Sequence, residues 1–343
     1  MKIQLKQKFK FTMFFITLTT CLAQAKTGKP DKDMEKVLME LQAKGGKPIE
    51  SLSATEARNQ PTPADAVKTI MKSENIINSP ELTEVKDIQV QGANGMLSAR
   101  IYIPKGKSSS VPVVVYYHGG GFVIASNDVY DATPRSLAEQ TKAIFVSVEY
   151  RKGPEFKFPA AHDDAFAAYK WILKNASTFG GDSKKIAVAG ESAGGNLALN
   201  VAIRARDEGL MIPVAELLVY PVAGNDMNTE SYQENANAKP LNKAMMGWFI
   251  KNYTSSQKET GDPRLNLLAA NFKGLNPAIV ITAEIDPLRS EGKTLSEKIK
   301  DSGVKVEYKN YNGVTHEFFG MSAVVKKAKD AQKFASDQLK KYL

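Results

Sequence analysis

The tightest constraint on the fold of this chain comes from five residues, Gly190-Glu191-Ser192-Ala193-Gly194. They lie between an apolar run, residues 186–189, and a helix-like run, residues 196–202. A serine on a strand-to-helix turn, with glycine two positions to either side, is typical of a nucleophile elbow. Such a turn is so tight that its central residue is strained and leaves no room for bulk two positions away. The pattern predicts a serine hydroxyl held above the positive end of a helix. The structural alternative is an ordinary glycine-rich turn with a serine cap.

A second glycine-rich segment, His118-Gly119-Gly120-Gly121-Phe122, directly follows the apolar run Val113–Tyr117. This pattern predicts a buried strand that opens into a loop with almost no side chains. The bare N–H groups of such a loop converge on one point, as the stabilisation of an oxyanion requires. The alternatives are a flexible turn or a phosphate cradle. The phosphate alternative lacks both a Gly-Lys-Ser/Thr ending and a spaced dinucleotide fingerprint.

Only three histidines are available as a general base: His118, His162 and His316. His118 leads into the glycine loop, where we expect it to hold the loop in shape. His162 opens a helix-like stretch, and we expect it to be a partly exposed helix-start residue. His316 follows a strand-like run, residues 304–309, and a turn containing Asn312-Gly313. A base on a loop after a late strand suits a serine nucleophile, so we predict that His316 is the base.

The candidate acid follows another buried-strand pattern, residues 278–283. Pro287 biases Asp286 toward an extended conformation, which ends the strand with a carboxylate at its tip. Asp286 would orient His316 and stabilise its imidazolium form. Glu284, two residues earlier, is the competing candidate, and either carboxylate would also serve simply to stabilise a turn.

Taken together, these motifs resemble the hormone-sensitive-lipase branch (bacterial family IV, with its GDXG motif) of the α/β-hydrolase esterases. The resemblance rests on His118–Phe122, Gly190–Gly195, Asp286–Leu288 and His316-Glu317-Phe318, together with residues 149–155 and 158–161. It covers about residues 35 to 340. It implies an α/β fold: a mostly parallel, twisted sheet flanked by helices, with a small helical cap.

The resemblance also assigns roles to residues. It implies a catalytic triad of Ser192, His316 and Asp286, and an oxyanion hole formed by the N–H groups of Gly120, Gly121 and Ala193. Gly119 would shape the loop, and Glu191 would tie the elbow to neighbouring loops, unless its side chain is simply exposed to solvent.

Three positions depart from the pattern of the family. Glu191 replaces aspartate, Glu317 replaces the glycine after the histidine, and Lys152-Gly153 replaces Leu-Ala. Glu317 places a charge beside His316 and would raise the pKa of that histidine. None of these changes removes a member of the predicted triad.

The predicted activity is hydrolysis of short- to medium-chain acyl esters through an acyl-enzyme intermediate. We expect a small-molecule ester as the partner, and no cofactor or metal, because three dispersed histidines form no recognisable ligand cluster. Amide hydrolysis on the same triad is an alternative. A non-catalytic small-molecule receptor is a second one, although the presence of His316 argues against it. A homodimer through an exposed edge strand is left open.

The N-terminus predicts a secretory signal. Four lysines within the first ten residues precede an apolar run, residues 11–22, and then Ala23-Gln24-Ala25. The run is too short to span a bilayer comfortably, and cleavage after Ala25 would give a secreted or periplasmic chain without a cysteine. Lipid attachment at Cys21 is the alternative.

Composition fits a soluble globular protein with a sizeable core, with 43% hydrophobic and 24% charged residues in 343. The net charge of +9 is partly N-terminal, and the remaining excess predicts no nucleic-acid partner. After the signal (1–25) we expect an N-terminal helical cap segment (26–85) and a catalytic domain (86–343) with a second cap segment near 224–256. In that second segment Met245, Met246, Trp248 and Phe249 would either line an acyl pocket or pack against the N-terminal helices.

Overall fold

One mixed sheet organises the chain. The computed structural model describes residues 28–106 and 110–343, and within them eight strands pair in the order β1-β2-β4-β3-β5-β6-β7-β8. β1 and β2 form an antiparallel hairpin, β2 pairs antiparallel with β4, and the pairs from β4 through β3 to β8 are parallel. The strands are β1 Leu82–Gly92, β2 Gly95–Pro104, β3 Val111–Tyr117, β4 Ile144–Val148, β5 Gly181–Glu191, β6 Glu216–Val219, β7 Ala278–Ile285 and β8 Val306–Thr315.

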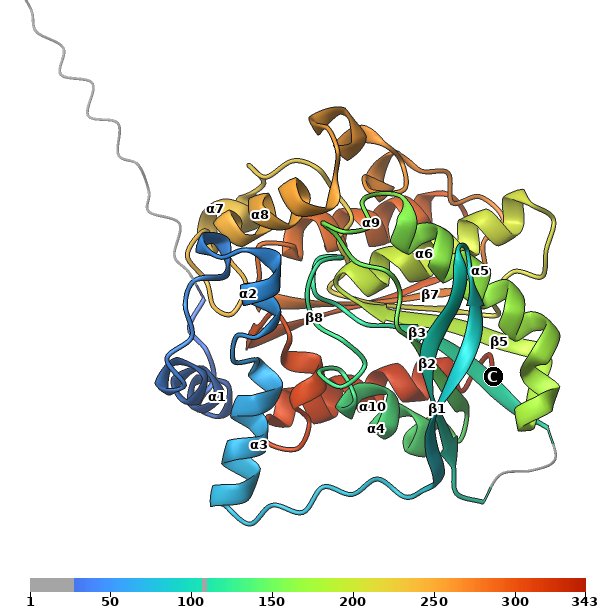
Figure 1. Ribbon diagram of the computed structural model, residues 1–343, viewed down its shortest axis with the longest axis horizontal. Coiled ribbons are helices and arrows are strands. Elements are labelled where there is room, and N and C mark those ends of the chain that lie inside the picture. The colour runs from blue at the N-terminus through green and yellow to red at the C-terminus, as the bar shows by residue number, and fades with distance from the viewer. Residues whose placement is uncertain (1–27, 107–109) are drawn as a thin grey trace, which may run out of the picture.

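Helices cover both faces of this sheet, so that α5, α6 and α9 lie on one side and α4 and α10 on the other (Figure 1). The α-helices are α1 Lys32–Ala43, α2 Ala54–Arg58, α3 Pro63–Ser73, α4 Ala132–Thr141, α5 Ala160–Asn175, α6 Ala193–Asp207, α7 Glu230–Glu234, α8 Lys243–Tyr253, α9 Arg289–Asp301 and α10 Lys326–Leu339. Short 3₁₀ turns are η1 Ile49–Ser51, η2 Ala176–Phe179, η3 Gln257–Gly261, η4 Leu267–Ala269 and η5 Phe318–Met321.

Strand β3 shows why its sequence is continuously apolar. Val113 and Val115 pack into the core beneath α5 and α6, whereas Val114 and Tyr116 pack into the core beneath α4 and α10. A parallel strand covered by helices on both faces has no solvent-facing side, so both alternating sets must be apolar. The sequence prediction of an α/β fold with a mostly parallel sheet is therefore confirmed.

The parallel strands end at one edge of the sheet, and the candidate residues follow their carboxyl ends. The glycine loop follows β3, Ser192 follows β5, Asp286 follows β7 and His316 follows β8. Ligands of open α/β sheets bind at this edge. The topology therefore brings together four segments that are far apart in the sequence.

The described part of the predicted N-terminal cap segment contains three α-helices. α1 starts at Lys32, and α2 starts after Ser53, whose side chain and Glu56 form a capping box. The 3₁₀ turn η1, which precedes α2, contacts α8. There the Trp248 indole donates a hydrogen bond of 2.9 Å to the Leu52 carbonyl oxygen, which joins the two segments predicted to form a cap.

One sequence prediction about the last strand, β8, is wrong. The predicted turn at Asn312-Gly313 is part of β8, which continues to Thr315. Gly313 has a φ of +68° and lies where the pairing with β7 shifts register, between Ala283 and Ile285. Glycine tolerates the left-handed backbone of such a bulge without a steric cost. Asn312-Gly313 therefore bends β8 instead of ending it.

The predicted signal segment, residues 1–25, and Cys21 within it lie outside the described residues. Across residues 28–106 and 110–343, none of the helices combines the length and the apolar character that crossing a bilayer requires.

Candidate active site

Ser192 occupies the sharp turn between β5 and α6, with φ 56° and ψ −118°. The turn tolerates no side chain at the two flanking glycines. A Cβ at Gly190 would lie 2.1 Å from the Gly194 carbonyl oxygen, and a Cβ at Gly194 would lie 1.9 Å from the Tyr117 carbonyl oxygen. The strained serine conformation and the spacing of the glycines are therefore parts of one geometry, as the sequence pattern predicts.

His316 lies between Ser192 and Asp286. Its Nε2 atom is 3.0 Å from Ser192 Oγ, and its Nδ1 atom is 2.7 Å from Asp286 Oδ2. All three side chains are buried. A carboxylate at Nδ1 favours the tautomer that carries the proton there, which leaves Nε2 free to accept the serine proton. The structure thus brings together the three side chains predicted from the sequence.

The competing carboxylate, Glu284, has a different partner. Its Oε2 atom accepts a hydrogen bond of 2.6 Å from the Gly313 N–H, at the bulge of β8. Asp286, in contrast, is fully buried, and its second oxygen accepts from the Leu288 N–H at 2.8 Å. The structure therefore places Asp286, and not Glu284, against the histidine.

The surroundings of His316 favour its protonated form. Burial lowers the pKa of His316, but the charge and hydrogen bond of Asp286 raise it more, and the charges of Glu317 and Glu191 add to the rise. The pKa is consequently above the ordinary value of a histidine, in the direction predicted for Glu317.

The glycine loop after β3 has the backbone that an oxyanion hole needs. Gly120 and Gly121 have φ values of 103° and 59°, and their N–H groups donate to no other backbone group in the described part of the chain. Ala193 is the first residue of α6, where an N–H has no partner within the helix. A Cβ at Gly121 would lie 2.3 Å from the ring of Phe249 on α8, so only glycine fits there.

His118 holds this loop, as expected from its position. Its ring stacks on Tyr150 with centroids 4.4 Å apart, and its Nδ1 atom lies 2.7 Å from the Gly119 carbonyl oxygen. The Tyr150 hydroxyl donates to the His118 carbonyl oxygen at 2.9 Å. Both the ring and the backbone of His118 are thereby fixed.

Glu191 ties the elbow to the neighbouring strands and is not exposed. It accepts hydrogen bonds from the hydroxyl of Tyr116 on β3, at 2.6 Å, and from the hydroxyl of Tyr220, which follows β6. Burial raises the pKa of Glu191 to about 7, although these hydrogen bonds oppose the rise. Tyr220 also lies against His316, with ring centroids 4.5 Å apart. No sequence motif singled out the two tyrosines.

His162 corrects a prediction. It is buried in α5 and not partly exposed, with its ring nitrogens 3.0 Å from the Tyr253 hydroxyl and from Asn196 Oδ1. Burial lowers the pKa of His162 to about 4. Two aspartates follow His162, and the second of them, Asp164, is itself buried in an ion pair with Arg151. The start of α5 therefore faces the core at both His162 and Asp164.

Two cavities lie near the elbow. The smaller, of about 40 Å³, borders the glycine loop that follows β3 and is lined largely by apolar side chains, including Phe122, Val222, Met246, Phe249 and Tyr253. In the predicted second cap segment, Met246 and Phe249 line this cavity, whereas Trp248 binds the N-terminal segment.

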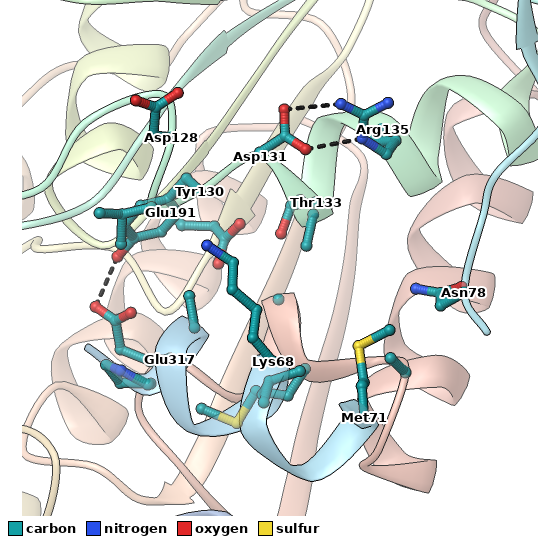
Figure 2. Close-up of a pocket in the computed structure, with 18 of the residues that line it drawn as sticks. Lys68, Met71, Asn78, Asp128, Tyr130, Asp131, Thr133, Arg135, Glu191 and Glu317 are labelled. Atoms are coloured by element: carbon teal, nitrogen blue, oxygen red, sulfur yellow. Dashed lines mark hydrogen bonds and ion pairs between the residues drawn. The ribbon is translucent and has the colours of Figure 1, made fainter. Parts of the chain in front are cut away.

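The larger cavity, of about 660 Å³, is lined in part by residues of α3 and α4, among them Lys68 and Thr133 (Figure 2). Its lining includes Glu191 and Glu317, the chain neighbours of Ser192 and His316, but neither of those two residues themselves. Figure 2 shows Tyr130 and Glu317 joined by a hydrogen bond at its wall. Among the described residues, no cluster of histidine, cysteine, aspartate or glutamate is arranged to hold a metal ion.

Known proteins are similar to this chain in sequence and in fold. A family model described as alpha/beta hydrolase fold matches residues 114–320. The carboxylesterase NlhH of Mycobacterium tuberculosis is 37% identical over 279 residues, which cover 79% of this chain and 88% of that protein. The ethyl acetate hydrolase of Pseudomonas putida is 29% identical over 321 residues, covering 92% of this chain and 99% of that protein.

Solved structures agree with these relatives. The crystal structure of a thermostable esterase from Pseudomonas putida superposes with a TM-score of 0.83 at 32% identity. The similarity covers 92% of this chain and 98% of that one. The correspondence therefore extends over nearly the whole of both proteins.

Proposed function

The chain belongs to the hormone-sensitive-lipase-like branch of the alpha/beta hydrolase family and is a carboxylic ester hydrolase, and from this premise we propose that Ser192 is the nucleophile of a serine carboxylesterase for short- to medium-chain acyl esters. One observation carries the proposal: Ser192 Oγ lies 3.0 Å from His316 Nε2, and His316 Nδ1 lies 2.7 Å from Asp286. This arrangement of nucleophile, base and orienting carboxylate is the one that acyl transfer requires.

In the first half of the reaction, Ser192 Oγ attacks the ester carbonyl carbon as its proton passes to His316 Nε2. The negative charge that develops on the carbonyl oxygen is stabilised by the N–H groups of Gly120, Gly121 and Ala193. The imidazolium then donates its proton to the alkoxy oxygen, the carbon–oxygen bond breaks, and the alcohol leaves. Asp286 stabilises the imidazolium without accepting its proton.

In the second half, His316 removes a proton from water, and the resulting hydroxide equivalent attacks the acyl-enzyme carbonyl. The same N–H groups stabilise the second tetrahedral intermediate. Its collapse releases the carboxylic acid and returns the proton to Ser192 Oγ. The raised pKa of His316 suits this repeated exchange, because the base must hold the proton until the leaving oxygen takes it.

The cavity beside the oxyanion loop supports a preference for small acyl groups. It is small, it is bounded by Phe249 and Tyr253 of α8, and its lining is largely apolar. The name of one relative, ethyl acetate hydrolase, points to a two-carbon acyl group for that protein. We therefore place the acyl chain of this enzyme against α8, with the shortest chains fitting best.

The test is hydrolysis of p-nitrophenyl esters from acetate to palmitate by the purified protein. The proposal predicts rates that are highest for short chains and lower by at least about a hundredfold in Ser192→Ala and in His316→Ala, because triad members act as a unit. p-Nitroanilides of the same acyl groups serve as the amide comparison. A folded wild type that cleaves none of the esters, or a Ser192→Ala variant that retains the wild-type rate, would refute the proposal.

Residues 1–25 carry a separate proposal, namely export of the chain and cleavage after Ala25 into the periplasm or the medium. Its support is the order of lysine-rich start, apolar run and Ala23-Gln24-Ala25. Mass spectrometry of the exported protein should find Lys26 as the first residue. A lipid-modified Cys21 would contradict the proposed cleavage site.

A further inference from the structure

Glu317, the residue after His316, occupies a backbone position that favours glycine. Its φ is 71° and its ψ is −1°, in the left-handed region. A glutamate gains nothing from this conformation, because its Cβ makes the left-handed backbone strained. Such strain persists only where surrounding contacts fix the residue, and here the Glu317 side chain makes such a contact.

The Glu317 side chain binds a residue from a different loop of the site. The Tyr130 hydroxyl donates a hydrogen bond of 2.6 Å to Glu317 Oε1 (Figure 2). Tyr130 is buried, and it lies in the segment that leads from the glycine loop into α4. The two partners are 187 residues apart in the sequence, so the bond links two loops that chain connectivity does not hold together.

The same hydroxyl contacts the oxyanion loop directly. A Cβ built on Gly119 would lie 2.1 Å from the Tyr130 hydroxyl oxygen, which means that this oxygen packs against the Gly119 backbone. The Tyr130 ring also lies beside His118, with centroids 5.9 Å apart. The position of Tyr130 therefore bears on the residues that set the oxyanion loop.

We propose that Tyr130 and Glu317 are a pair of positioning residues, which fix the loop of the catalytic base relative to the loop of the oxyanion hole. The inference rests on the proposed serine esterase function. In that reaction the N–H donors and the imidazole must act on the same tetrahedral centre, and a displacement of either loop by a fraction of an ångström lowers the rate. Neither side chain touches the reacting atoms, so both act through the two loops.

Glu317 has a second effect, which acts through charge and which variants can separate. His316 is faced by Asp286 at the end of β7, Glu191 at the end of β5, and Glu317 beside it. Glu291 on α9 and the Tyr220 ring also face it. Glu317 in turn interacts with Tyr116, Tyr130, Tyr220 and Glu191, and shares its cavity with Lys68 of α3.

Two conservative variants distinguish position from charge. Tyr130→Phe removes the hydrogen bond and keeps the Glu317 charge. We expect kcat for p-nitrophenyl butyrate to fall about tenfold, with KM within twofold and the acid limb of the pH profile in place. Glu317→Gln keeps an acceptor oxygen for Tyr130 and removes the charge. We expect kcat on the pH plateau within twofold of the wild type, and an acid limb of kcat/KM shifted to lower pH.

Glu317→Gly provides the third variant, because glycine suits the left-handed backbone and should preserve the fold. It removes both the hydrogen bond and the charge, so we expect both the lower kcat and the shifted acid limb. The matched control is Tyr169→Phe on α5. This tyrosine is also buried and donates to a backbone oxygen, that of Met211 at 2.7 Å, but it lies outside the site, and we expect wild-type kcat.

The outcomes are decisive for the pair. A Tyr130→Phe or Glu317→Gly enzyme with kcat within twofold of the wild type overturns the proposal, whatever its melting temperature, because a purely structural role alters stability alone. A lower kcat in both, with Tyr169→Phe unaffected, supports it. Absence of esterase activity in the wild type would instead refute the proposed function, so the two failures are distinguishable.

Discussion

The Oδ2 atom of Asp286 lies 2.7 Å from Nδ1 of His316, whereas Glu284, two residues earlier and within β7, binds the Gly313 N–H at the bulge of β8. The two carboxylates therefore have separate tasks. In the proposed mechanism Asp286 orients His316, whereas Glu284 binds the backbone at the bulge of β8.

This division predicts different results for two isosteric changes. Asp286→Asn should lower kcat by about four orders of magnitude, because an amide no longer favours the tautomer with a free Nε2. Glu284→Gln keeps an oxygen that accepts from Gly313, so its kcat should stay within about tenfold of the wild type. Steady-state hydrolysis of p-nitrophenyl butyrate, with circular dichroism to confirm folding, measures both. A crippled Glu284→Gln beside an active Asp286→Asn would reverse the assignment.

Glu191 makes a prediction about stability, because its pKa in the folded protein is about 7 against an ordinary value of 4.5. Between these pH values the folded state binds more protons than the unfolded state, so the free energy of unfolding falls as the pH rises. Integrated over the window, this one group costs about 3 kcal/mol above pH 7 relative to below pH 4.5.

Urea unfolding of Glu191→Gln at several pH values measures this cost. The variant cannot ionise at position 191, so its stability relative to the wild type should increase steadily from pH 4.5 to 7. The glutamine side chain still offers one oxygen as an acceptor for the hydroxyl groups of Tyr116 and Tyr220. A difference that is independent of pH would mean that Glu191 does not take up a proton on folding.

The sequence identified the residues at strand ends because local patterns encode them. Ser192 is marked by the glycines around it, and Asp286 and His316 follow strand-like runs that form β7 and part of β8. The parallel sheet then places their strand ends together without further information. The position of each element is thus a local property, and the meeting of the triad follows from the topology.

The residues that sequence reasoning missed are those whose partners are distant. Tyr220 and Tyr130 are ordinary aromatic residues by pattern, and their hydroxyls acquire meaning only from Glu191 and Glu317. His162 was misjudged for the same reason, because its partners are Asn196 and Tyr253 on other helices. Helical periodicity predicts which face of a helix is buried, but it does not predict which polar side chains of other elements that face contacts.

Phe249 provides a prediction about the acyl chain. Its ring fills the space into which a Cβ on Gly121 would project, and it lines the small cavity beside the oxyanion loop. Phe249→Ala should therefore enlarge this cavity and move the optimum of the p-nitrophenyl ester series toward longer chains. The neighbouring change Trp248→Phe, on the side of α8 that binds Leu52, is the control and should leave the optimum in place. An unchanged optimum in Phe249→Ala would place the acyl chain elsewhere.

His162 should change the free energy of unfolding with pH in the opposite direction to Glu191. Burial lowers the pKa of His162 to about 4 from an ordinary 6.5, so below pH 6.5 the unfolded state binds the extra proton. Its contribution is fully present above pH 6.5 and is lost as the pH falls toward 4, by about 3 kcal/mol. His162→Gln retains groups that can bond Asn196 and Tyr253 but takes up no proton. Urea unfolding should therefore show that the variant gains stability relative to the wild type as the pH falls from 6.5 to 4, whereas Tyr253→Phe should show no such trend. The contribution of Glu191 changes in the opposite direction over the overlapping pH range, so the two groups offset each other in the wild type, and the two single variants are needed to resolve them.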